Sequence, residues 1–213
     1  PVFADIEPDT LNINFTEIKK NITSKTKAIL VVHYGGHACD MDPILGIAKE
    51  KKIHVVEDAA HGCGGEYKRQ KLGSLGDLGC FSFHAVKNLS TGEGGMITTD
   101  DPVIYRKLLK LRWMGISKDT WTREEKDEKY SWYYKVEEVG FKYHMNDIPA
   151  AIGLVQLKKL DRMNQKRKEI TDKYNQGLKG LKWLETPTIK PYAEPSHHNY
   201  VIKVEKRDQL NIY

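Results

Sequence analysis

Lys87 follows a short apolar segment and lies in a stretch rich in Ser, Thr and Gly, an unusual place for a solvated surface charge. The amine of a lysine can form a Schiff base with an aldehyde. Upstream, an apolar run ends in Glu57-Asp58-Ala-Ala-His61, which supplies a carboxylate and an imidazole. A carboxylate can keep the nitrogen of an aromatic ring protonated, and such a ring acts as an electron sink.

Lysine, acid and histidine at the ends of successive buried strands are the parts of a site for pyridoxal phosphate (PLP). Ser82 alternates with two phenylalanines. If those rings face the core, the Ser82 hydroxyl faces the loop that carries Lys87 and could bind a phosphate. Each residue alone also has a structural interpretation, because Asp58 could cap the next segment and His61 or Ser82 could simply be packed.

The elements that must position these residues begin with two apolar runs. Residues 28–33 predict a fully buried strand, and 53–57 predict a second one. Between them, 41–52 has the pattern of a helix, with Asp42 as its cap and Pro43 in the first turn. A strand, a helix and a strand with short links make a βαβ unit, so the strands should be parallel and ligands should bind at their carboxyl ends.

Further along, His84 and Asn88 lie close to Lys87 in the sequence and are candidates for the substrate side of the site. The remaining pattern predicts a loop over 62–79 and two strands, 80–83 and 95–99, that flank the Lys87 loop. A helix over 102–113 follows, capped by Asp100-Asp101-Pro102 and with one apolar side. Residues 115–139 form a long charged and aromatic excursion. One long helix should then run from Asn146 past residue 170 and end at Gly177 and Gly180, before a β-rich segment, 183–205, with a strand at 200–204.

The composition bounds the class of protein. At 213 residues, with 39% hydrophobic and 30% charged residues, the chain can form one good core and the start of a second domain. No apolar run approaches a membrane span, and a diffuse net charge of +5 does not suggest nucleic acid. The three cysteines form no CxxC pair and indicate a reducing compartment, so we expect a cytoplasmic protein.

A zinc site is the main chemical alternative. Five side chains could converge at the same sheet edge, as in a metal-dependent hydrolase: His33, His37, Asp58, His61 and His84. No pair of them has an HxE or HExxH spacing, and a zinc site leaves Lys87 without a role. We therefore expect no metal ion.

Several ordered motifs resemble the DegT/DnrJ/EryC1/StrS family of sugar aminotransferases. The segments that carry the resemblance extend over almost the whole chain: Pro1–Ile6, Asp9–Leu11, His33–Gly36, Asp40–Asp42, Val55–His61, Gly76-Asp77, Phe81–Asn88, Gly92–Gly95, Gly140–Met145 and Ala150–Leu157. The resemblance implies an α/β, aspartate-aminotransferase-like fold (PLP fold type I) with a mostly parallel sheet. It also implies a PLP-binding large domain over 1–160, whose N-terminal part precedes Pro1, and the start of a small α+β C-terminal domain over 161–213.

By the same resemblance, Lys87 would carry PLP as a Schiff base, Asp58 would pair with the pyridinium nitrogen, His61 would lie beside the ring and Ser82 would bind the phosphate. Family members are homodimers with shared sites, in which one residue reaches the phosphate of the neighbouring subunit. Lys142 stands at that position in place of an Asn, and His144 replaces an Arg two residues later. A lysine can still serve a phosphate as a point charge.

The resemblance implies amino transfer from an amino acid, expected to be glutamate, to a nucleotide-linked keto sugar. One alternative is a dehydratase of the same family, but those relatives replace the lysine with His, and Lys87 is present. Another is a non-catalytic regulator on the same scaffold, against which the intact Lys87, Asp58 and Ser82 argue.

Overall fold

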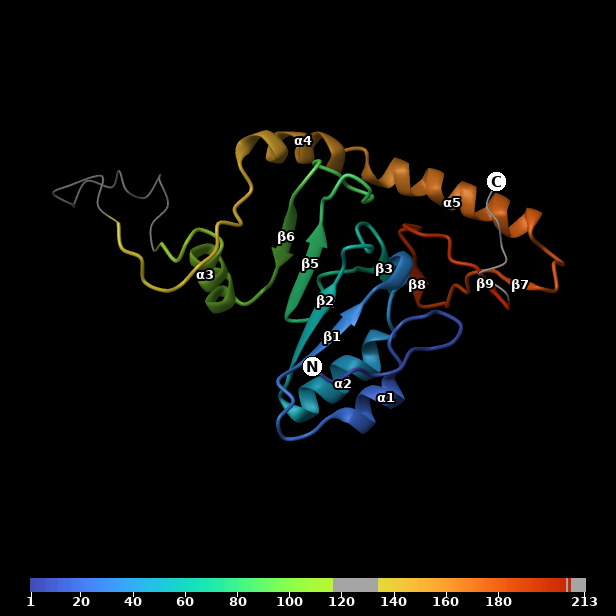
Figure 1. Ribbon diagram of the computed structural model, residues 1–213, viewed down its shortest axis with the longest axis horizontal. Helices are drawn as coiled ribbons and strands as arrows, with labels where there is room; N and C mark the ends of the chain where they lie inside the picture. The colour runs from blue at the N-terminus through green and yellow to red at the C-terminus, as the bar shows by residue number, and fades with distance from the viewer. Residues whose placement is uncertain (117–133, 206, 208–213) are drawn as a thin grey trace. The chain divides into compact units, whose positions relative to one another are not determined.

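The computed structural model describes residues 1–116, 134–205 and 207 (Figure 1). The chain divides into two compact units, one of residues 1–98 with 148–213 and one of residues 99–147. Most of the predicted excursion at 115–139 lies outside the described residues. No helix in the described part of the chain is both long and apolar enough to cross a membrane.

The first unit is built on a sheet with the strand order β1-β2-β5-β6 (Figure 1). Its strands are β1 (Ala28–Val32), β2 (His54–Asp58), β5 (Leu78–Ser82) and β6 (Gly95–Thr98). The first three are parallel, and β6 is antiparallel to β5. The predicted βαβ unit is therefore confirmed, and so is the mostly parallel sheet.

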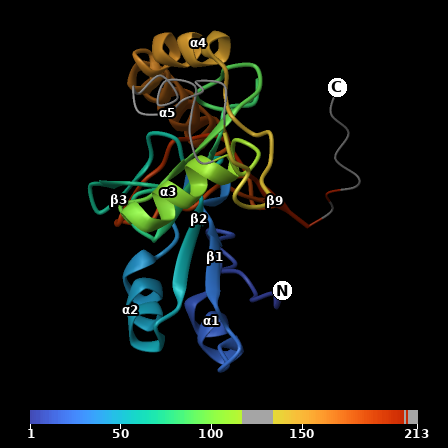
Figure 2. The same cartoon turned by 90° about the vertical axis from the view of Figure 1, so that its left-hand side faces the viewer.

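Helices α1 (Phe15–Asn21) and α2 (Met41–Lys51) lie side by side next to the sheet (Figure 2). Ile44 and Ile47 of α2 join Ile29 and Val31 of β1 in the buried core. The residue at the N-cap position of α2 is Asp40, so the prediction of Asp42 as the cap is wrong. Asp42 lies in the first turn and forms an ion pair with Lys68.

Only one face of β1 is buried. Ile29 and Val31 point into the core, whereas Leu30 is 60% exposed and Val32 is 39% exposed. The prediction of a fully buried strand is therefore wrong for the residues that the structure describes. The reason is that the helix residues of the buried core pack against the face with Ile29 and Val31, and the described residues leave the face with Leu30 and Val32 largely uncovered.

The predicted loop 62–79 contains a hairpin of β3 (Glu66–Tyr67) and β4 (Gln70–Lys71), and β8 (Ala193–Glu194) pairs with β3. The turn residues Lys68 and Arg69 both have positive φ, at 47° and 70°. A two-residue hairpin turn with two positive φ angles normally uses Asn or Gly, so this sequence carries no turn signal. The predicted strand at 200–204 is reduced to β9 (Lys203–Val204), which pairs with β7 (Leu184–Glu185).

The predicted long helix is two helices, α4 (Asp147–Leu157) and α5 (Leu160–Gly177), with a turn at 158–159. Neither Gly nor Pro marks the break, so local propensity favours a continuous helix through it. The expected end at Gly177 is confirmed. The apolar side chains of α4 are exposed, among them Leu154 and Leu157.

The second unit contains α3 (Pro102–Leu111), whose start is as predicted. Asp101 accepts hydrogen bonds from the Val103 and Ile104 N–H groups, which identifies it as the N-cap. None of the residues of α3 is buried, so the expected buried side is wrong within the described residues.

Candidate active site

Asp58 ends β2 and faces the same side of the sheet as two residues of β5. Its Cα partner across the sheet is Cys80, and the two-residue period of a strand places Ser82 on that same side. The Asp58 carboxylate accepts a hydrogen bond from the Ala60 N–H at 3.0 Å. Burial and the charge of Asp58 raise the pKa of the Cys80 thiol, as expected for close neighbours.

Lys87 lies half-buried in the loop that joins β5 to β6. The Lys87 N–H donates to the His84 carbonyl at 2.9 Å and closes a turn. The base of the loop is held by the backbone of Phe83, whose N–H donates to Gly94 at 2.8 Å and whose carbonyl accepts from Thr91 at 2.9 Å. The lysine is thus carried on a short loop whose two ends are tied together.

The structure brings His61 into the electrostatic reach of both Lys87 and Asp58. Burial, followed by the charge of Lys87, lowers the pKa of the His61 imidazole, and the Asp58 charge opposes this shift. The Gly35 N–H donates to Nδ1 of His61 at 3.3 Å. Nδ1 is therefore an acceptor, and the proton of the neutral ring is on Nε2.

The remaining predicted residues differ in their surroundings. His84 is exposed, with its Nε2 3.8 Å from the Glu93 carboxylate. The Asn88 side chain donates to the Ser196 carbonyl and to Asn164, and its oxygen lies 2.8 Å from His198 Nδ1. Lys142 belongs to the second unit, where it is exposed and its backbone pairs with Trp113. Its predicted role toward a phosphate stays a prediction.

Two histidines of the zinc alternative have other partners. His33 bonds to Glu57 and to the Cys39 N–H. His37 accepts from the Lys190 N–H through Nε2 and lies 2.7 Å from the Ala38 carbonyl through Nδ1. Across the described ranges, no three or more His, Cys, Asp or Glu side chains are grouped so that they could hold a metal ion.

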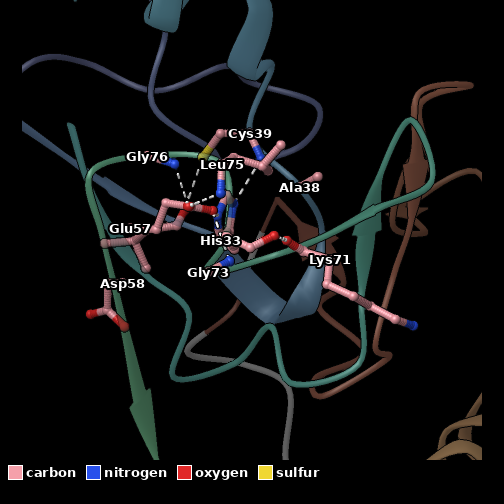
Figure 3. Close-up of polar contacts among 12 residues, drawn as sticks. His33, Ala38, Cys39, Glu57, Asp58, Lys71, Gly73, Leu75 and Gly76 are labelled. Atoms are coloured by element: carbon pink, nitrogen blue, oxygen red, sulfur yellow. Dashed lines mark hydrogen bonds and ion pairs between the residues drawn. The ribbon is translucent and has the colours of Figure 1, made fainter. Parts of the chain in front are cut away.

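Glu57 is a structural residue of this region that the sequence analysis did not identify. Its side chain is 0% exposed, and four donors surround the carboxylate (Figure 3). These are His33 Nε2 at 2.8 Å and the N–H groups of Gly73, Leu75 and Gly76 at 2.8, 2.7 and 2.7 Å.

Burial raises the pKa of the Glu57 carboxyl, but the hydrogen bonds from His33 and from the glycine N–H groups outweigh it and lower the pKa overall. Asp58 points away from this network (Figure 3). Two adjacent acids therefore have different tasks, because successive side chains of a strand face opposite sides. That alternation is the signal that could have separated them in the sequence.

A C-terminal segment also joins the site. Ser196 is fully buried, and its hydroxyl donates to the His61 carbonyl at 2.5 Å. The Ser196 N–H donates to the Gly36 carbonyl at 3.1 Å, and the Asn199 N–H donates to the Gly35 carbonyl at the same distance. No pattern in the sequence predicts these contacts, because the Ser196–His61 bond joins positions 135 residues apart.

We expect Gly36→Ala to destabilise the full chain by about 1–3 kcal/mol. Gly36 has φ +95°, and an added Cβ would lie 2.1 Å from the Ser196 hydroxyl oxygen. The matched control is Gly46→Ala within α2, where a Cβ meets nothing within 4 Å. This control should be neutral or stabilising by about 0.5–1 kcal/mol. Urea unfolding measures both, and equal stabilities would contradict the tight packing of Ser196 against Gly36.

The residues at this edge of the sheet fit PLP in their chemistry. Lys87 offers an amine, Asp58 a carboxylate that can pair with a ring N–H, and His61 an imidazole near both. Within the described residues, the Ser82 hydroxyl proton has no acceptor, so it is available to an anion; its oxygen only accepts a long 3.4 Å bond from the His84 N–H. The chain thus offers an amine that can react with an aldehyde, a carboxylate that can accept a hydrogen bond from a ring N–H, and a hydroxyl that can donate a hydrogen bond to a phosphate.

Comparison with known proteins agrees with this chemistry. The family model described as "DegT/DnrJ/EryC1/StrS aminotransferase family" matches residues 1–212. The chain is 50% identical over 212 residues to the uncharacterized protein MJ1066 of Methanocaldococcus jannaschii, covering 100% of this chain and 54% of that protein. It is 44% identical over 207 residues to the spore coat polysaccharide biosynthesis protein SpsC of Bacillus subtilis, covering 97% and 53%. The chain therefore spans about half the length of the curated relatives it matches.

Among solved structures, the fold is similar to that of the putative sugar aminotransferase Spr1654 from Streptococcus pneumoniae. Its PMP-form is 34% identical with a TM-score of 0.87, covering 96% of this chain and 56% of that chain. Its PLP-form has a TM-score of 0.84 at 32% identity, covering 96% and 55%. The expected fold of a PLP-type sugar aminotransferase is thereby confirmed. The match of the family model over nearly every residue shows that this chain belongs to the DegT/DnrJ/EryC1/StrS aminotransferase family.

Proposed function

We propose that the protein with this chain is a PLP-dependent aminotransferase that moves an amino group from glutamate to a nucleotide-linked keto sugar, in amino-sugar or polysaccharide biosynthesis. The observation that carries the proposal is that the charges of both Lys87 and Asp58 act on His61, with Asp58 at the carboxyl end of the parallel strand β2. The polysaccharide pathway in the name of SpsC and the PMP-form of Spr1654 support it.

Each residue has a role that follows from its chemistry. When bound, PLP supplies an electron sink for the amino group that is transferred. Lys87 anchors the cofactor by its amine and, once released and neutral, takes a proton from the α-carbon of the amino donor. Asp58 holds the ring nitrogen protonated, and Ser82 binds the phosphate.

His61 contributes a neutral ring. Burial and the nearby Lys87 lower the pKa of its imidazole, so His61 is uncharged at neutral pH. A neutral ring adds no second positive charge beside Lys87 and can pack against the cofactor ring. In a homodimer with shared sites, Lys142 would reach the phosphate held by the neighbouring subunit.

The whole protein that contains this chain, mixed with PLP, should show the visible absorbance of PLP joined to a lysine. Adding glutamate should bleach this band and release 2-oxoglutarate in equal amount, because the amino group passes to the cofactor. A nucleotide-linked keto sugar should then restore the band, and the same keto sugar without the nucleotide should not. No band, or a band that glutamate leaves unchanged, would contradict the proposal.

A further inference from the structure

His198 lies in the same C-terminal segment as Ser196 and contacts two neighbours of Lys87. Its ring stacks on the His61 ring, with 4.4 Å between centroids and 28° between planes. Its Nδ1 is 2.8 Å from Oδ1 of Asn88, the residue that follows Lys87. One side chain thus links the imidazole beside the lysine to the loop that carries the lysine.

The partners of Asn88 determine the protonation of His198. Asn88 Nδ2 donates to the Ser196 carbonyl at 2.8 Å and to Asn164 Oδ1 at 2.9 Å, so both amide hydrogens are used. Oδ1 of Asn88 can then only accept, and His198 Nδ1 must donate. In the neutral ring, the lone pair is therefore on Nε2.

The charges around His198 favour that neutral ring. Burial is the largest cause that lowers the pKa of the His198 imidazole, and the charges of His61, Lys87 and Arg167 lower it further, to about 4. At neutral pH the ring is uncharged, so it can stack on His61 without repelling the cationic groups beside it.

We propose that His198 is a positioning residue of this site, which holds the His61 ring by stacking and the Asn88 side chain by its Nδ1–H. The two contacts keep the imidazole and the lysine-bearing loop in place relative to each other. The positioning of His61 and Asn88 stands on this geometry alone, and only its consequence for catalysis rests on the proposed function.

The side chain of His198 is not needed to anchor its own segment. The backbone of the segment bonds to Gly35 and Gly36 through the Asn199 and Ser196 N–H groups. Substitutions at His198 should therefore leave the fold intact and change only what the ring contacts.

Three variants of the full chain separate the two contacts. His198→Phe keeps a ring on His61 and loses the bond to Asn88. His198→Asn keeps an N–H donor for Asn88 and loses the ring, and His198→Ala loses both. The first readout is the NMR titration of the His61 imidazole in the protein without PLP, assigned with His61→Gln.

In the wild type and in His198→Phe, the midpoint of the His61 titration should lie below that of a solvated imidazole. In His198→Ala and His198→Asn it should move upward, because water reaches the uncovered ring and burial is the main cause of the lowered pKa of His61. The charged groups that act on His61, Lys87 and Asp58, are unchanged in every variant.

The second readout is kinetic. His198→Phe and His198→Ala should lower kcat about tenfold with little change in KM, because the loop with Lys87 loses its hydrogen bond, and His198→Asn, which keeps an N–H donor for Asn88, should recover part of that loss. An unchanged His61 midpoint in both His198→Ala and His198→Asn would overturn the proposal. If the wild type forms no band with PLP, the proposed function fails, and the titration of His61 still decides the role of His198.

Discussion

Replacing Lys87 by alanine should abolish the covalent linkage of PLP to the protein and lower kcat for amino transfer at least about a thousandfold. The variant loses the amine that anchors the cofactor and the base that moves the proton. The fold should be unaffected, because the Lys87 loop is held through its backbone and through the Asn88 side chain. The measurement is reduction of the PLP-loaded protein with borohydride, followed by peptide mass spectrometry, with kcat determined in parallel.

Two control variants make this result specific. Lys87→Arg keeps a positive charge but cannot form a Schiff base, so it should fail in the same way as alanine. Lys20→Ala removes an exposed lysine whose amine pairs with Glu17 one turn away in α1, and it should behave like the wild type. A PLP-modified peptide that does not contain Lys87, or a fully active alanine variant, would disprove the assignment.

Glu57→Gln should destabilise the full chain by about 3 kcal/mol at neutral pH. The four groups around the carboxylate are all donors. A glutamine has the same shape, but it places an NH₂ group against two of these donors, and the site is too buried for water to compensate. Urea unfolding of the variant measures the loss.

The contribution of Glu57 to the stability of the fold should decrease as the pH falls. Since folding lowers the pKa of the Glu57 carboxyl, its stabilising contribution is fully present above the ordinary carboxyl pKa and is lost as pH falls through the lowered value. The difference in stability between wild type and Glu57→Gln should therefore shrink in acid. Glu50→Gln, at an exposed acid of α2 that pairs with Lys51, is the control and should change stability little. Equal stability of the two variants would rule out the buried network.

The central strands and the position of the site were predictable because both depend on local patterns. Apolar runs at 28–33 and 53–57 with a helix between them specify parallel strands, and the polar residue that ends a strand lies at the sheet edge. Asp58, which ends β2, was chosen as a candidate in this way. The exposure of Leu30 was not predictable, since an apolar run does not show which of its two faces other elements cover.

Other features depend on competition between local preference and packing. The turn at Lys68 and Arg69 carries no turn residue, and the break between α4 and α5 carries no Gly or Pro. After this break, Asn164 of α5 donates to the Cys63 carbonyl at 3.0 Å and accepts from Asn88. Contacts of this kind offset the modest cost of a broken helix, and no local pattern records them.

The sequence by itself determined that two strands and the helix between them form a parallel βαβ unit, and it carried the motifs of the DegT/DnrJ/EryC1/StrS aminotransferase family, because these are properties of short segments. Only the tertiary structure decided that Glu57 is a buried anchor and that His198 contacts Asn88, 110 positions earlier in the chain. The physical reason is that such contacts form when the packing of the whole unit brings distant segments together, and they require no particular residues next to them in the sequence.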